Sequence, residues 1–266
     1  MKILFISLGC DKNLADSEEM LGLLTGNGHE IVDSEEEADA IVINTCCFIH
    51  DAKEESVNTI LEMAEYKKTG TCKILIVTGC MAQRYKEEIT EEIPEVDAVL
   101  GTTSYGDIVK ALNEAEAGHV FREFKDINAL PEDSGRRVIT TGGHFGYLKI
   151  AEGCDKHCTY CIIPSLRGKF RSVPEERLLK QAEYMASQGV RELILVAQET
   201  TVYGTDLYGK KTLHILLKKL CQIKGIRWIR VLYCYPEEIY DELIQVMKEE
   251  KKICHYLDLP IQHASD

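Results

Sequence analysis

The stretch KILFISLGCDKNLADSEEMLGLLTGNG, residues 2–28, joins an apolar run to a helical pattern. The run KILFIS is typical of a buried strand. The following DSEEMLGLLTGNG predicts a helix with Asp16 or Ser17 as its N-cap, because acidic residues follow at once, and with a stop at Gly26 and Gly28. A buried strand that leads into a helix of this length is the repeating unit of an α/β fold with a parallel sheet.

The same alternation occurs three more times before residue 118, where the runs ADAIVINT, CKILIVTG and DAVLG each precede a helical pattern. Residues 1–118 are therefore predicted to form an N-terminal parallel-sheet α/β domain. Residues 119–143 mix charge, glycine and short β-like runs, and we expect a linker there. The strand-helix rhythm returns in residues 144–266, which predicts the N-terminal part of a (βα) barrel that is truncated at the C-terminus.

Composition narrows the class of protein. The chain has 266 residues, a formal net charge of -13 and 11 cysteines. No apolar run approaches the ~18 residues that a membrane span needs, and the N-terminus lacks the features of a signal peptide. We therefore expect a cytoplasmic protein that does not enter a membrane. In that reducing compartment, many cysteines indicate metal binding or catalysis, and the negative charge favours a basic partner over naked nucleic acid.

A second stretch, EGCDKHCTYCIIPSLRG at residues 152–168, places Cys154, Cys158 and Cys161 in a C-x3-C-x2-C spacing after a predicted strand. Three thiolates can hold three corners of an iron–sulfur cube and leave the fourth iron without a protein ligand. The alternative is a structural zinc site, which closes with four protein ligands. His157 would have to fold back to be the fourth, so the zinc alternative is weaker but stays open.

The N-terminal domain has a cysteine pattern of its own. Cys10, Cys46 and Cys80 each follow an apolar strand and precede a helix. In a parallel sheet these positions emerge at one edge, which predicts a second site with three thiols. Cys47 is predicted to point away from its neighbour. For a single cysteine the usual interpretation is a small buried hydrophobe, and we apply it to Cys72, Cys221, Cys234 and Cys254.

The C-x3-C-x2-C motif, with an aromatic residue just before its last cysteine, resembles the cluster motif of radical S-adenosylmethionine (SAM) enzymes. The resemblance implies that Cys154, Cys158 and Cys161 bind a [4Fe-4S] cluster whose open iron is chelated by SAM, and that Tyr160 lies beside the adenine. It also implies that the predicted barrel is a radical SAM barrel.

A three-cysteine α/β domain before such a barrel resembles the layout of the methylthiotransferases. The resemblance covers nearly all of the chain, in the blocks SLGCDKNLADSE, NTCCFI, VTGCMAQRY, GCDKHCTYCIIPSLRG, VAQETTVYG and LDLPIQHASD. It implies that Cys10, Cys46 and Cys80 bind an auxiliary [4Fe-4S] cluster that supplies sulfur. Members of this family also carry a small target-binding β-barrel, which we expect to lie beyond the chain given.

Two branches of the family differ in their targets. One modifies an adenosine of tRNA, and the other modifies the β-carbon of an aspartate of a small-subunit ribosomal protein. The chain most resembles the ribosomal-protein branch, through Lys12, Asn13, Leu14 and Ser165. It departs from that branch's usual pattern at Asp11, Ala15 and Cys47. The implied enzyme is a SAM-dependent radical methylthiotransferase, with a ribosomal-protein substrate and an electron donor such as a flavodoxin or ferredoxin.

Other residues near strand ends are candidate contacts for SAM or substrate. Gln198 and Glu199 end the second predicted barrel strand, where ligands of βα folds are met. Arg167 and Arg171 could pair with the SAM carboxylate or the target aspartate, or could simply lie on the surface. His263 could face the barrel interior or be structural. The alternative functions are a tRNA adenosine methylthiotransferase, an iron–sulfur electron carrier and a zinc-stabilised binding module.

Overall fold

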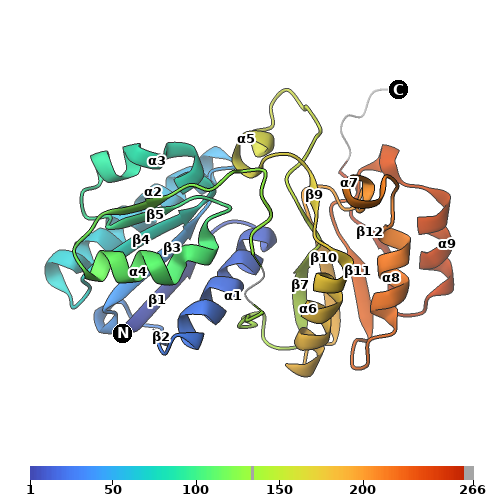
Figure 1. Cartoon of the computed structure of the whole chain (residues 1–266), viewed down its shortest axis with the longest axis horizontal. Coiled ribbons are helices and arrows are strands. Elements are labelled where there is room, and N and C mark those ends of the chain that lie inside the picture. The colour runs from blue at the N-terminus through green and yellow to red at the C-terminus, as the bar shows by residue number, and fades with distance from the viewer. Residues whose placement is uncertain (133–134, 261–266) are drawn as a thin grey trace. The chain divides into compact units, whose positions relative to one another are not determined.

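The computed structural model describes residues 1–132 and 135–260 (Figure 1). The chain forms two compact units. The first unit contains Met1–Val138 together with His157–Arg167. The second contains Ile139–Lys156 together with Gly168–Asp266, of which residues up to 260 are described. The segment His157–Arg167 therefore belongs to the first unit, although the residues on both sides of it belong to the second.

The first unit is built on a six-stranded parallel sheet with strand order β2-β1-β3-β4-β5-β6. Its central strands are buried along their whole length, as expected for a parallel sheet covered on both faces. The strands are β1 (Lys2–Ser7), β2 (Glu30–Val32), β3 (Ala40–Thr45), β4 (Ile74–Gly79), β5 (Ala98–Leu100) and β6 (Phe121–Glu123). The sequence predicted four of these six strands. The two others, β2 and β6, are three-residue strands at the sheet edges.

Four helices cover the two faces of this sheet: α1 (Asp11–Gly26), α2 (His50–Thr69), α3 (Cys80–Glu92) and α4 (Ile108–Glu116), with short 3-10 turns η1 (Glu35–Glu37) and η2 (Tyr105–Asp107). Helices α1 and α4 pack on one face, where Met20 and Leu24 meet Ile108 and Leu112 in one core cluster. Helices α2 and α3 pack on the other face (Figure 1). The predicted α/β class of this domain is thereby confirmed.

Helix α1 begins six or seven residues earlier than the sequence predicted. Its N-cap is Cys10, not Asp16 or Ser17, and its first residue is Asp11. The predicted N-cap is wrong because Asp16 has another use: its carboxylate pairs with a buried arginine and caps no helix. The early start places Asn13 on the first turn of the helix, next to the first cysteine.

Part of the segment expected as a linker belongs to the first unit. Strand β6 lies within residues 119–143 and extends the sheet beyond β5. Further along, Arg137 Nη2 pairs with Glu18 Oε2 at 2.6 Å, and the Val138 backbone N–H donates to the Glu18 carbonyl at 3.0 Å. Helix α1 is therefore held by a chain segment that follows it by more than a hundred residues.

The second unit contains a four-stranded parallel sheet with strand order β12-β11-β10-β7. Its strands are β7 (Phe145–Lys149), β10 (Glu192–Val196), β11 (Trp228–Val231) and β12 (Ile253–Leu257), and its main helices are α6 (Glu175–Ser187), α8 (Leu213–Cys221) and α9 (Asp241–Glu249). Each strand neighbours the next in chain order, as the predicted βα repeats require.

Shorter elements complete the molecule. In the second unit they are the antiparallel ribbon of β8 (Ala151–Glu152) and β9 (Arg171–Ser172), helix α7 (Thr205–Tyr208) and the 3-10 turn η3 (Pro236–Glu238). Helix α5 (Ile163–Arg167) belongs to the first unit. Among the described residues, no helix combines the length and apolar character that a bilayer crossing requires.

Candidate functional site

Three cysteines gather at the carboxyl edge of the first unit's sheet. Cys10 follows β1, Cys46 follows β3, and Cys80 is the first residue of α3 after β4. Strands β1, β3 and β4 are neighbours in the sheet, and the strand order reverses at β1. The crevice at such a reversal is where open α/β sheets bind their ligands.

The thiols of these cysteines are close enough to influence one another. A methyl group built on Gly9, the residue before Cys10, would lie 3.0 Å from Cys46 Sγ. The pKa of the Cys80 thiol is raised to about 12, mainly by burial and to a smaller extent by Cys46 and Cys10. Burial also raises the pKa of Cys46, with an additional contribution from Cys10. The structure therefore brings together the three residues that the strand pattern singled out.

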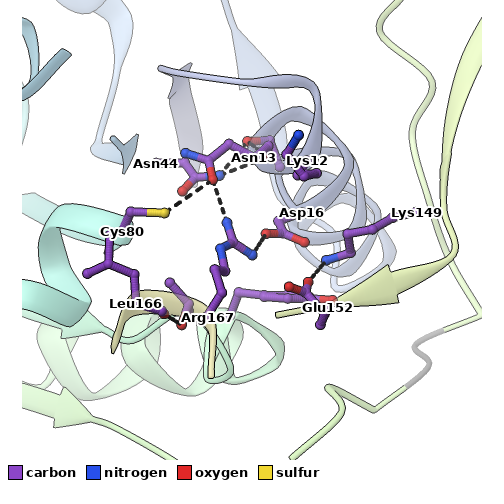
Figure 2. Close-up of polar contacts among 12 residues, drawn as sticks. Lys12, Asn13, Asp16, Asn44, Cys80, Lys149, Glu152, Leu166 and Arg167 are labelled. Atoms are coloured by element: carbon purple, nitrogen blue, oxygen red, sulfur yellow. Dashed lines mark hydrogen bonds and ion pairs between the residues drawn. The ribbon is translucent and has the colours of Figure 1, made fainter. Parts of the chain in front are cut away.

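Asn13 ties the ends of two of these strands together. Its Nδ2 donates to the Leu8 carbonyl at 3.1 Å and to the Thr45 carbonyl at 3.0 Å. Its Oδ1 accepts a contact from Cys80 Sγ at 3.8 Å (Figure 2). One side chain on the first turn of α1 thus touches the chain before Cys10, the chain before Cys46, and Cys80 itself.

A buried arginine lies against the same side chain. Arg167 is 2% exposed, its Nη1 pairs with Asp16 Oδ2 at 2.8 Å, and its Nη2 donates to Asn13 Oδ1 at 2.5 Å (Figure 2). Its positive charge lowers the pKa of the Cys80 thiol, although burial has the larger, opposite effect. A purely surface role for Arg167 is therefore wrong. No local sequence pattern indicates this contact, because Arg167 lies 151 and 154 residues away from its two partners in the chain.

Three thiols at one sheet edge are a donor set of the kind that can hold an iron–sulfur cluster. Among the residues that the structure describes, no group of three His, Cys, Asp or Glu side chains could hold one metal ion. A structural zinc requires all of its ligands to converge on one point. A cubane is held through separate irons, one for each thiolate, so its ligands stand farther apart. The chemistry of three thiols around one sheet edge suits the second kind of site.

The C-x3-C-x2-C cysteines are divided between the two compact units. Cys154 belongs to the second, where its backbone N–H donates to the Gly168 carbonyl at 3.1 Å and its Sγ accepts from the Lys156 N–H at 3.4 Å. Cys158 and Cys161 belong to the first, where the Cys161 N–H donates to the Cys158 carbonyl at 3.0 Å. All three cysteine residues are half-buried.

Each of the two parts of the chain matches the model of a known protein family. Residues 2–101 match the model of the uncharacterized protein family UPF0004, and residues 148–266 match that of the radical SAM superfamily. Residues 148–266 are thus similar to radical SAM enzymes. The resemblance to the methylthiotransferases is confirmed by the relatives described next.

Two curated relatives are both named ribosomal protein uS12 methylthiotransferase RimO. The protein from Lachnoclostridium phytofermentans is 68% identical and the one from Clostridioides difficile is 53% identical, each over the whole of this chain. The chain spans 60% of the length of each. Among solved structures, the radical SAM methyltransferase TsrM from Kitasatospora setae, with tryptophan and a SAM analogue bound, matches 99% of this chain and 60% of that chain with a TM-score of 0.64. At 11% identity this match concerns the fold.

Gln198 and Glu199, which follow strand β10, differ in their surroundings. Gln198 Oε1 is buried and has no hydrogen-bond partner among the described residues. Glu199 is 3% exposed and accepts from the backbone N–H groups of Thr201 at 3.0 Å and Tyr235 at 3.3 Å. Burial raises the pKa of Glu199. Gln198 and Glu199 therefore differ: the Gln198 acceptor has no partner among the described residues, whereas Glu199 orders its own loop.

The other residues that the sequence analysis considered differ widely in exposure. Tyr160 is 80% exposed, so its ring is accessible to an adenine. Arg171 lies on β9 opposite Glu152 and donates from Nη1 to the Lys169 carbonyl. His263 lies outside the described residues. The cysteines expected to be core residues are buried at Cys72, Cys221 and Cys234 and half-buried at Cys254.

Proposed function

We propose that the full-length protein inserts a methylthio group on the β-carbon of an aspartate of ribosomal protein uS12, using SAM and two [4Fe-4S] clusters. The observation that carries this proposal is the meeting of Cys10, Cys46 and Cys80 at the edge formed by β1, β3 and β4. SAM cleavage by itself requires one set of three thiolates. A second set in a separate α/β domain supports a reaction that also needs a source of sulfur.

The roles of the chain's residues follow from their chemistry. Cys154, Cys158 and Cys161 would hold the cluster that reduces SAM, and the other three thiols would hold the cluster that supplies sulfur. Gln198 Oε1 would accept a hydrogen bond from a SAM hydroxyl or ammonium group, since a buried acceptor without a partner is costly. The Tyr160 ring would stack on the adenine.

The charge of the chain supports a protein substrate. A net charge of -13 attracts a basic ribosomal protein and repels the phosphates of tRNA. The chemistry also requires a one-electron donor, for which a flavodoxin or ferredoxin is suitable, and a cytoplasmic location where ribosomal proteins are made. These partners belong to the proposal for the full-length protein.

The proposal is tested with full-length protein whose clusters are reconstituted without oxygen. Incubation with SAM, reductant and purified uS12 is expected to add one methylthio group to a single aspartate, as read by peptide mass spectrometry. Cys46→Ala should abolish this product while 5′-deoxyadenosine still forms. Cys72→Ala, which removes a buried core thiol, is the matched control and should keep the product.

Other outcomes identify the alternatives. Methylthio-adenosine in tRNA with unmodified uS12 would replace the ribosomal substrate with the tRNA one. Absence of 5′-deoxyadenosine from a fully reconstituted brown protein would favour an electron carrier. A colourless protein that binds zinc and no iron would favour the binding module and reject the enzyme.

A further inference from the structure

Arg167 follows the cysteine motif in sequence, and its side chain is buried in the first unit. Its guanidinium pairs with Asp16 at 2.8 Å and with Asn13 at 2.5 Å. Both partners lie on α1, the helix whose N-cap is Cys10. Burying a cation is costly unless charge and hydrogen bonds compensate it. Asp16 and Asn13 supply that compensation, so the charge of Arg167 is held in a fixed place.

The guanidinium lies next to the three thiols. Asn13 Oδ1 accepts from Arg167 Nη2 and also contacts Cys80 Sγ at 3.8 Å, so the cation and this thiol share one oxygen atom. The same Asn13 bonds the carbonyl of Thr45, the residue before Cys46. The side chain of Asn13 therefore links the guanidinium of Arg167 to Cys80 and to the residue before Cys46.

This placement has an electrostatic consequence for any cluster bound there. Three thiolates give an iron–sulfur cluster net negative charge, and each added electron makes it more negative. A nearby fixed cation stabilises the reduced form most, and hydrogen bonding and charge near the sulfurs set reduction potentials. Arginine suits this use because it keeps its charge when buried. Asp16 acts in the opposite direction, because its carboxylate offsets part of the guanidinium charge.

We propose that Arg167 is a positioning residue of the auxiliary site: a fixed cation, held by Asp16 and Asn13, that stabilises a cluster on Cys10, Cys46 and Cys80 and raises its reduction potential. The inference rests on the proposed function, because it assumes the second cluster. It gives Arg167 a role toward the N-terminal thiols, although the residue follows the C-x3-C-x2-C motif in sequence.

The test uses full-length protein carrying Cys154→Ala, Cys158→Ala and Cys161→Ala, so that iron binds only at the N-terminal thiols. In this background Arg167→Gln should lower the midpoint potential, and Asp16→Asn should raise it. We expect each shift to be about tenfold in the reduction equilibrium, or about 59 mV for one electron. Arg167→Gln should also lose iron to a chelator about tenfold faster, as is typical when a residue supporting a metal site is removed.

Arg137 supplies a matched control. It is another buried arginine paired with a carboxylate of α1, at 2.6 Å from Glu18. Arg137→Gln therefore removes a comparable ion pair from the same helix, and it should leave the potential unchanged. Arg167→Lys, which keeps the charge, should recover most of the potential lost in Arg167→Gln.

The outcomes separate the inference from the function on which it rests. If the background variant binds no iron, the second cluster and the inference both fail. If it binds iron but Arg167→Gln and Asp16→Asn match Arg137→Gln in potential, only the inference fails. Should Arg167→Gln not fold, Asp16→Asn decides alone: a higher potential supports the role of Arg167, and an unchanged or lower one overturns it.

Discussion

At the scale of single residues, the thiol site depends on how closely two chain segments approach. Gly9 has a φ of +92°, and a methyl group placed on it would lie 2.6 Å from Cys46 Cβ. Real Cβ atoms do not approach so closely, so a larger residue would push β1's end away from Cys46. Glycine thus contributes to this site by lacking a side chain.

Gly9→Ala is expected to destabilise the first unit and to impair iron binding by Cys10 and Cys46. The backbone cost of a positive φ is about 1–2 kcal/mol, and the steric overlap adds about 1–3 kcal/mol. Gly28 is the matched control, because its φ is +85° and nothing lies within 4 Å of a methyl group there. Gly28→Ala should show the backbone cost alone in urea unfolding, with normal iron content. Equal losses in the two variants would contradict the steric argument.

At the scale of elements, helix α5 shows how the first unit holds part of the cysteine motif. Leu166 is 2% exposed and packs in the core cluster that contains α2 and α3 residues. The Leu166 carbonyl accepts from Thr102 Oγ1 at 2.8 Å. These contacts anchor the segment that carries Cys158 and Cys161 to the sheet of the first unit.

Leu166→Ala is expected to destabilise the first unit by about 2–5 kcal/mol, the usual cost of emptying a buried leucine site. Hydrogen exchange across residues 157–167 should accelerate, because their main apolar anchor is lost. Leu61→Ala on α2 is the control, since Leu61 is 48% exposed, and it should change stability by under about 0.5 kcal/mol. Unaltered exchange in Leu166→Ala would show that the segment is held by other contacts.

At the scale of the whole molecule, the two sets of thiols are expected to load independently. After anaerobic reconstitution of the full-length protein, Cys154→Ala, Cys158→Ala and Cys161→Ala together should leave about half of the iron and sulfide. Cys10→Ala, Cys46→Ala and Cys80→Ala together should leave the other half. Loss of all iron from either triple variant would contradict independent loading, and iron and sulfide assays decide between these results.

Much of this organisation could be predicted because it depends on local pattern. The long apolar strands and their following helices were identifiable, and parallel pairing then placed Cys10, Cys46 and Cys80 at one edge. Strands β2 (EIV) and β6 (FRE) contain charged residues and are only partly buried, so they lack the apolar run that identified the equally short β5 (AVL). The contacts of Arg167 with α1 join residues over 150 positions apart, and no local pattern encodes them. The early start of α1 was missed because Cys10 is not a typical N-cap.

Asn13 has a consequence for anyone who wishes to graft this thiol site onto another doubly wound scaffold. Both of its amide hydrogens and its oxygen are engaged, by two strand-end carbonyls, Arg167 and Cys80. An aspartate of the same shape would set a negative oxygen against those carbonyls. Transplanting the three cysteines without this amide would therefore leave the recipient loops at the wrong separation, so Asn13 has to be moved together with them.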